Sequence, residues 1–154
     1  MKIADILAPE RVITEITAAS KRDILEELAR PVSGAMNIDL QELVEVLMAR
    51  EALGSTGIGE GVAIPHGKVQ GLRDMVAVLG RSSRGLDFNA IDRKPCHIFF
   101  MLLAPSNSAS QHLKALARAS TLLKDPSLRQ KILESSSSAE IYSLVVDYDS
   151  GLED

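Results

Sequence analysis

A histidine follows a glycine-rich segment near the middle of this chain. Residues 54–68 have the sequence GSTGIGEGVAIPHGK, in which five of fifteen positions are glycine and His66 follows Pro65. A neutral imidazole is an available nucleophile near neutral pH, because its pKa is normally about 6.5. Its attack on a phosphoryl group would give a phosphoramidate, which releases that group readily. Glycines beside the ring would let a partner and backbone N–H groups come close to the phosphate.

Other interpretations of the segment can be compared with this one. A P-loop requires Ser or Thr after Gly-Lys, but Val69 follows Lys68, so this motif is excluded. A dinucleotide-binding fingerprint requires GxGxxG between a strand and a helix. The spacing from Gly57 to Gly61 is wrong for it, and the segment leads into the strand-like Val62-Ala-Ile64. A plain connection between a helix and a strand, with an ordinary histidine behind it, remains open on these residues alone.

The surrounding residues resemble a known family. Arg50-Glu51 followed by GSTGIGEGVAIPHGK is similar to the enzyme IIA domains of the bacterial phosphoenolpyruvate-dependent phosphotransferase system, of the fructose/mannitol type. The likeness is greatest to the nitrogen-regulatory branch. It continues in the same order along nearly the whole chain, through GLDFNAID at 85–92, Pro95, FMLLAP at 100–105 and QHLKAL at 111–116.

The resemblance implies roles for three residues. It implies that His66 is phosphorylated on Nε2 by a histidine phosphocarrier protein of the HPr or NPr kind. Arg50 matches an arginine that the family places near the phosphohistidine, where a guanidinium would supply paired donors to phosphate oxygens. His112 matches a second active-site histidine, which would contact the phosphoryl group or orient His66. No cofactor is implied, because the phosphoryl group is carried covalently.

Supporting contacts are expected from residues beside these three. Ser55, Thr56 and Gly67 could offer hydroxyl or backbone donors to phosphate, although Ser and Thr near a helix end commonly cap it. Lys68 could help to recruit an acidic or phosphorylated partner. Cys96 and His97 are a poor metal-chelating pair, because adjacent residues on a strand point to opposite faces. No metal-binding spacing occurs in the chain, so we expect no metal site.

Composition excludes some classes of protein. The 154 residues carry a formal charge of −4 with acids and bases interspersed, and only 3% are aromatic, which argues against direct nucleic-acid binding. The single cysteine excludes an internal disulfide and fits a reducing compartment. The N-terminus is no signal peptide, and the longest apolar run, Ile98–Ala104, is far shorter than the roughly 20 residues needed to cross a bilayer. We therefore expect a cytoplasmic location without membrane insertion.

The apolar pattern predicts the fold class. We expect one domain over residues 1–154 with an ordered core at about 4–147 and a frayed tail at 149–154. Its class is α/β (α+β), a three-layer arrangement of helices, mixed β-sheet and helices, because the strands are apolar throughout and need cover on both faces. The strands are expected at 11–16, 75–79 and 96–103. Helices are expected after Ser20, after Asp39, at 109–123, after Pro126 and at 139–146, and Pro31 should kink or end the first of these.

Three functions compete at this point. The first is a phosphoryl carrier of the nitrogen-regulatory branch, whose phosphorylation state at His66 controls partners; the resemblance implies potassium-transport or sensor-kinase components among them. The second is a sugar-specific enzyme IIA that passes phosphate to a fructose or mannitol IIB domain. The third, of another class, is a protein-binding module that shares the fold and carries no phosphate.

Overall fold

The computed structural model describes residues 1–152, which form one mixed sheet between two groups of helices. The helices are α1 (Lys21–Met36), α2 (Leu40–Glu51), α3 (Ala109–Leu123), α4 (Pro126–Glu134) and α5 (Ser138–Ser150), preceded by 3-10 turns at Ile3–Asp5 and Pro9–Arg11. The strands are β1 (Val12–Ile13), β2 (Gly57–Gly59), β3 (Val62–Ala63), β4 (His66–Val69), β5 (Val76–Leu86) and β6 (Cys96–Pro105).

The sheet is built around the long antiparallel pair β5 and β6. Its order is β1-β5-β6-β3-β2, and β4 pairs with β6 further along the same strand. The pairings β1–β5, β3–β6 and β4–β6 are parallel, and β2–β3 is antiparallel. Strands β3 and β4 pair with successive parts of β6, so the glycine-rich segment runs along this strand. His66 therefore lies opposite Leu102.

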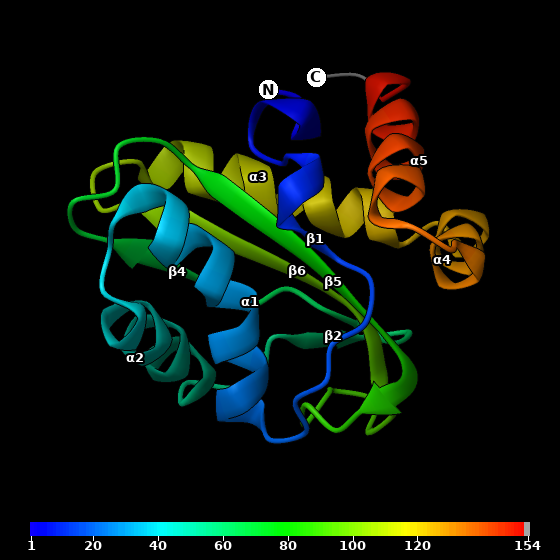
Figure 1. The fold of residues 1–154 in the computed structure, drawn as a ribbon, viewed down its shortest axis with the longest axis horizontal. Helices are drawn as coiled ribbons and strands as arrows, with labels where there is room; N and C mark the ends of the chain where they lie inside the picture. Colours follow the sequence, from blue (N-terminus) through cyan, green and yellow to red (C-terminus); the bar gives the residue numbers. More distant parts are fainter. Residues whose placement is uncertain (153–154) are drawn as a thin grey trace.

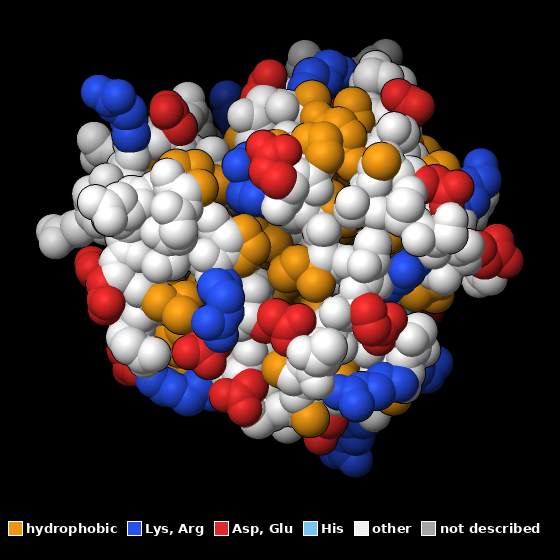
Figure 2. All heavy atoms as spheres, viewed as in Figure 1, with side chains coloured by type: hydrophobic (Ala, Val, Ile, Leu, Met, Phe, Trp, Pro, Cys, Tyr) orange, Lys and Arg blue, Asp and Glu red, His pale blue; other side chains and the backbone are white. Residues whose placement is uncertain are grey.

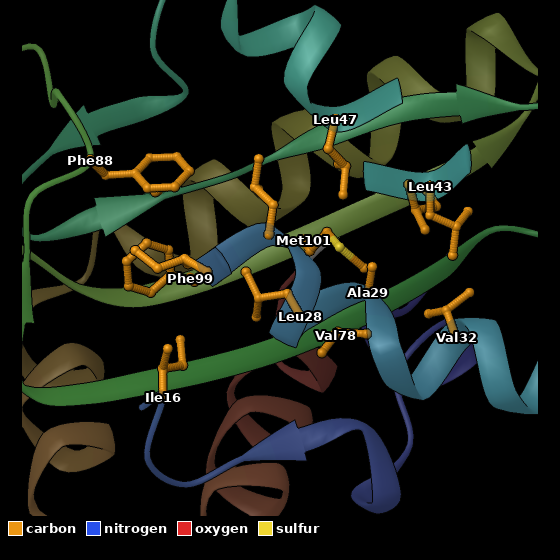
Figure 3. Packing of buried hydrophobic residues seen from close by; sticks show 14 of the residues in the cluster. Ile16, Leu28, Ala29, Val32, Leu43, Leu47, Val78, Phe88, Phe99 and Met101 are labelled. Carbon is orange, nitrogen blue, oxygen red and sulfur yellow. The ribbon is translucent and has the colours of Figure 1, made fainter. Parts of the chain in front are cut away.

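Alternate side chains of the central strands pack against different helix layers. Phe99 and Met101 of β6 join Val78 of β5 in a core under α1 and α2, where Figure 3 shows them meeting Leu28 and Leu47. The next residues along each strand contribute instead to a second core with α3, α4 and α5; they include Ala77, Leu79, Phe100 and Leu102. Figure 1 shows the two helix groups on opposite sides of the sheet. The predicted three-layer fold class is confirmed.

Helix starts follow the predicted capping residues. Ser20 and Asp39 accept hydrogen bonds from the backbone N–H three residues later, and so begin α1 and α2. The sequence left open whether Pro31 would kink or end the first helix. Helix α1 continues past it to Met36 and ends where Asn37 adopts a left-handed conformation with φ of 55°.

Two expectations near the chain ends differ from the structure in their bounds. The strand expected at 11–16 is regular only at Val12–Ile13, although Ile16 still donates its N–H to Arg81. Val12 and Ile16 are both buried, but an extended segment can bury such side chains without forming regular hydrogen bonds to a neighbouring strand. The tail expected to fray from 149 is helical through Ser150, because buried Asp149 accepts hydrogen bonds from the Ile3 N–H at 2.6 Å and Arg118 Nε at 2.5 Å. The last part of that prediction, 153–154, lies outside the described residues.

Charges of both signs are mixed on the surface. On the face in Figure 2, Lys and Arg side chains lie among Asp and Glu, with no continuous basic band. Figure 1 shows the N-terminus beside the end of α5. In the described part of the chain, none of the helices has both the length and the apolar content that a bilayer crossing requires.

Candidate functional site

His66 opens β4 with its ring held by the backbone just before it. Its Nδ1 lies 2.8 Å from the carbonyl oxygen of Ile64, across Pro65, whose ring fixes the local backbone. A carbonyl oxygen can only accept, so Nδ1 must carry the hydrogen. In the neutral ring the lone pair is therefore on Nε2. This contact selects the tautomer in which Nε2 is the nucleophilic nitrogen.

Arg50 contacts that same nitrogen from the last turn of α2. Its Nε lies 3.2 Å from His66 Nε2, and its Nη1 donates to the Gly54 carbonyl at 2.8 Å. Burial lowers the pKa of His66 most, and the Arg50 charge lowers it further; the Ile64 hydrogen bond and the Glu51 charge act in the opposite direction. The net result is a pKa below the ordinary value, which keeps His66 neutral and nucleophilic at neutral pH.

His112 of α3 lies beside the His66 ring. The two imidazole centroids are 5.4 Å apart, with the ring planes at 74°. The His112 side chain is buried, and its Nε2 has no hydrogen-bond partner within residues 1–152. Burial, then the charges of His66 and Lys68, lower its pKa. An unpaired buried nitrogen costs about 1–3 kcal/mol. A hydrogen-bonding group that reached this nitrogen would remove that cost.

The two hydroxyls expected to support phosphate are engaged elsewhere. Thr56 donates both its N–H and its hydroxyl to the carboxylate of Glu51. Ser55 donates its hydroxyl to the Phe88 carbonyl at 2.6 Å and accepts from the Gly57 N–H. These contacts shape the loop that follows α2. In this structure the two side chains therefore hold the loop beside the site and do not present free hydroxyl donors to it.

Gly67 and Lys68 differ in their surroundings. Gly67 lies in the β4–β6 ladder opposite Leu103, and a Cβ built on it would be 2.4 Å from Val46 Cγ1 of α2. Lys68 is exposed, and its positive charge is close enough to lower the pKa of His112. The site thus combines two neutral imidazoles with a guanidinium and an ammonium nearby, a set that favours an anion.

Two functional neighbours were not singled out from the sequence. Ile64 contacts His66 through its backbone carbonyl, and a backbone contact of this kind cannot be predicted from residue types. Glu51 is buried beside Arg50, where it pairs with Lys21 at 2.9 Å, and the Lys21 ammonium also lies 4.6 Å from the centre of the Phe88 ring. The available signal for Glu51 was an acid next to the predicted arginine at the end of a helix, three residues before Gly54.

The third histidine lies apart from this group. His97 is on β6, where its Nδ1 is 2.9 Å from the Ser82 carbonyl. The neighbouring Cys96 is fully buried, and burial raises the pKa of its thiol to about 12. Neither side chain takes part in the contacts around His66. His97 therefore provides a matched control for substitutions of the other two histidines.

Comparison with known proteins places this site in a family context. A sequence model described as "Phosphoenolpyruvate-dependent sugar phosphotransferase system, EIIA 2" matches residues 5–148. A nitrogen regulatory protein of Bradyrhizobium diazoefficiens is 39% identical over 145 residues, which is 94% of this chain and 95% of that protein. A fructose-specific EIIABC component of Bacillus subtilis is 34% identical over 97% of this chain and 24% of its own length.

Solved structures give the same picture. The nitrogen regulatory protein IIA-Ntr from Neisseria meningitidis superposes with a TM-score of 0.87 at 31% identity, covering 93% of this chain and 98% of that one. IIA mannitol from Escherichia coli has a TM-score of 0.73 at 22% identity over 90% of this chain and 97% of its own, a likeness of fold.

Proposed function

The chain belongs to the EIIA 2 family of the phosphoenolpyruvate-dependent sugar phosphotransferase system, with nitrogen regulatory proteins among its relatives, and on that premise we propose that His66 is its phosphoryl acceptor. The donor is a histidine phosphocarrier protein of the HPr or NPr kind. The observation that carries the proposal is the cluster of Arg50, His66 and His112, in which Nε2 of His66 holds the lone pair.

In the proposed reaction, His66 Nε2 attacks the phosphorus of the donor's phosphohistidine. The new N–P bond forms as the donor's N–P bond breaks, and the bonding electron pair returns to the donor imidazole. The His66 Nδ1 proton stays in place, where the Ile64 carbonyl at 2.8 Å stabilises the positive charge that develops on the ring. Transfer of this kind depends on positioning and electrostatics more than on covalent help from the protein.

Arg50 and His112 hold the transferred group. As Nε2 becomes bonded to phosphorus, the Arg50 guanidinium turns from the ring nitrogen to the phosphoryl oxygens. The unpaired Nε2 of His112, carrying a hydrogen, donates to another of these oxygens. Lys68 adds positive charge at the edge of the site. All three contacts are stronger with the phosphoryl group present than without it, so they favour its capture.

Phosphorylation changes what the surface around His66 can bind. The phosphoryl group adds about 1.5 to 2 negative charges at neutral pH, by analogy with other phosphoresidues. A partner that fits the neutral site is then repelled, or an arginine-rich one is attracted. On the nitrogen-regulatory assignment the partners are regulatory targets, such as potassium-transport or sensor-kinase components.

The test is incubation of the full chain with phosphoenolpyruvate, enzyme I and the phosphocarrier, followed by intact mass. We expect one phosphoryl group per chain, labile in acid and stable in base. His66→Ala should abolish it, and His97→Ala should retain it, because that ring is elsewhere on β6. Full labelling of His66→Ala would refute the assignment.

A second candidate is the sugar-transport branch. It is favoured by the fructose-specific relative from Bacillus subtilis, whose 34% identity is close to the 39% of the nitrogen regulatory relative. This branch uses the same chemistry at His66 and adds onward transfer to a IIB domain. Mixing the phosphorylated chain with purified fructose and mannitol IIB domains decides between them. Loss of the label to IIB would favour sugar transport, and its retention would favour regulation.

A further inference from the structure

Gly67 lies where a Cβ would overlap the side chain of Val46 on α2. A Cβ at this position would lie 2.4 Å from Val46 Cγ1, whereas the next nearest atom, the Val46 carbonyl oxygen, is at an ordinary 3.7 Å. The backbone does not require glycine here, since Gly67 is absent from the positive-φ glycines, unlike Gly59 and Gly61. The missing side chain therefore serves the contact between β4 and α2 and not a turn.

The helix face that contacts Gly67 also carries Arg50. Val46 and Arg50 are four residues apart on α2, so they project from the same face one turn apart. His66 and Gly67 are neighbours on β4 and point to opposite sides of the sheet. Gly67 faces α2, and His66 faces His112 on α3. Arg50 must therefore reach past the strand, and its contact with His66 depends on how closely α2 lies against β4.

The hydrogen bond between Arg50 and His66 would not survive a large displacement of α2. The bond from Arg50 Nε to His66 Nε2 is already 3.2 Å, at the long end of the hydrogen-bond range of about 2.7–3.2 Å. Val46 Cγ1 would have to move by about 1.1–1.6 Å, from 2.4 Å to normal carbon contact at about 3.5–4.0 Å. The side chain can absorb little of this, because a helical valine has one strongly preferred χ1 rotamer. Arg50 would move with the helix, because its Nη1 donates a hydrogen bond to the carbonyl oxygen of Gly54, just beyond the helix end.

We propose that Gly67 is a positioning residue for phosphoryl transfer: its lack of a side chain lets α2 lie against β4 and so places Arg50 on Nε2 of His66. This inference rests on the proposed function of His66. It assigns to Gly67 a role different from that of a backbone donor to phosphate. It also implies that the Val46 side chain occupies the space that a Cβ at Gly67 would fill.

The test compares Gly67→Ala, Val46→Ala, the double variant Gly67→Ala/Val46→Ala and the reference Arg50→Ala. The control is Gly34→Ala, since a Cβ at Gly34 of α1 meets nothing within 4 Å. Two quantities are measured on each full chain. One is the pKa of His66, followed by NMR of the imidazole nitrogens without any phosphate donor. The other is the rate of phosphoryl transfer from the phosphorylated carrier.

Gly67→Ala should change both quantities in the same direction as Arg50→Ala. The Arg50 guanidinium stays in the chain but moves away from His66 Nε2, so its lowering of the His66 pKa weakens and that pKa should rise. Transfer should slow by about tenfold or more, since one well-placed donor typically contributes about 10²–10³ in rate. The double variant should regain most of both properties, because Val46→Ala removes the clashing atom. Gly34→Ala should match the wild type in both.

Three results would overturn the proposal. The first is a Gly67→Ala chain with the wild-type His66 pKa and rate. The second, which matters if Gly67→Ala does not fold, is a folded double variant whose His66 pKa stays at the Arg50→Ala value. The third is a Gly34→Ala chain that shows the same changes as Gly67→Ala. A wild-type chain that accepts no phosphate refutes the proposed function instead, and the pKa comparison still tests the role of Gly67.

Discussion

Glu51→Gln should destabilise the fold through a buried ion pair beside the site. The Glu51 side chain is 3% exposed, and it pairs with Lys21 while accepting both hydrogen bonds from Thr56. The glutamine keeps the shape but leaves the Lys21 ammonium without its counter-charge. Breaking a fully buried pair costs about 3–5 kcal/mol. Lys21 is 19% exposed, so water offsets part of the loss, and we expect about 2–3 kcal/mol.

Urea unfolding measures this loss directly, and thermal unfolding should show it as a fall of about 4–12 °C for a chain of this length. The matched control is Glu45→Gln, which breaks the exposed Arg22–Glu45 pair and should cost less than about 1 kcal/mol. The Glu51 charge also raises the pKa of His66, so the same variant should lower that pKa. A Glu51→Gln chain no less stable than Glu45→Gln would refute this account of the pair.

Two further outcomes follow from the structure. The pKa values of His66 and His112 are lowered in the folded chain, so their contribution to stability is full above the unfolded value of about 6.5 and is lost as the pH falls below it. The free energy of unfolding should drop from pH 7 toward pH 5, and the double variant His66→Gln/His112→Gln should show a smaller drop. If urea titrations gave the same drop for this variant, the two histidines would not be its cause. Asp149→Ala should cost about 2–3 kcal/mol, because it removes a buried carboxylate that pairs with Arg118 and accepts the Ile3 N–H. The exposed Asp147→Ala should cost less than about 0.5 kcal/mol, and equal losses on thermal unfolding would show that the end of α5 is not anchored.

The sequence by itself determined the layers of the fold and singled out the central residue of the candidate site. Two short, nearly continuous apolar runs are typical of strands covered on both faces, and they lie in β5 and β6. Ser20 and Asp39 marked helix starts because capping is local chemistry. His66 was singled out because the glycine-rich segment, Pro65 and His66 are contiguous, so their pattern is complete within one stretch of chain.

Only the tertiary structure decided which residues contact His66 and which tautomer it adopts. Arg50 lies sixteen positions before His66, and His112 is on a helix from the other side of the sheet, so their meeting depends on how α2 and α3 pack on β4 and β6. The tautomer depends on one backbone carbonyl, that of Ile64, and the hydroxyls of Ser55 and Thr56 turned to other partners. Such choices depend on how segments that are distant in the sequence pack together, which residue types and local spacing do not specify.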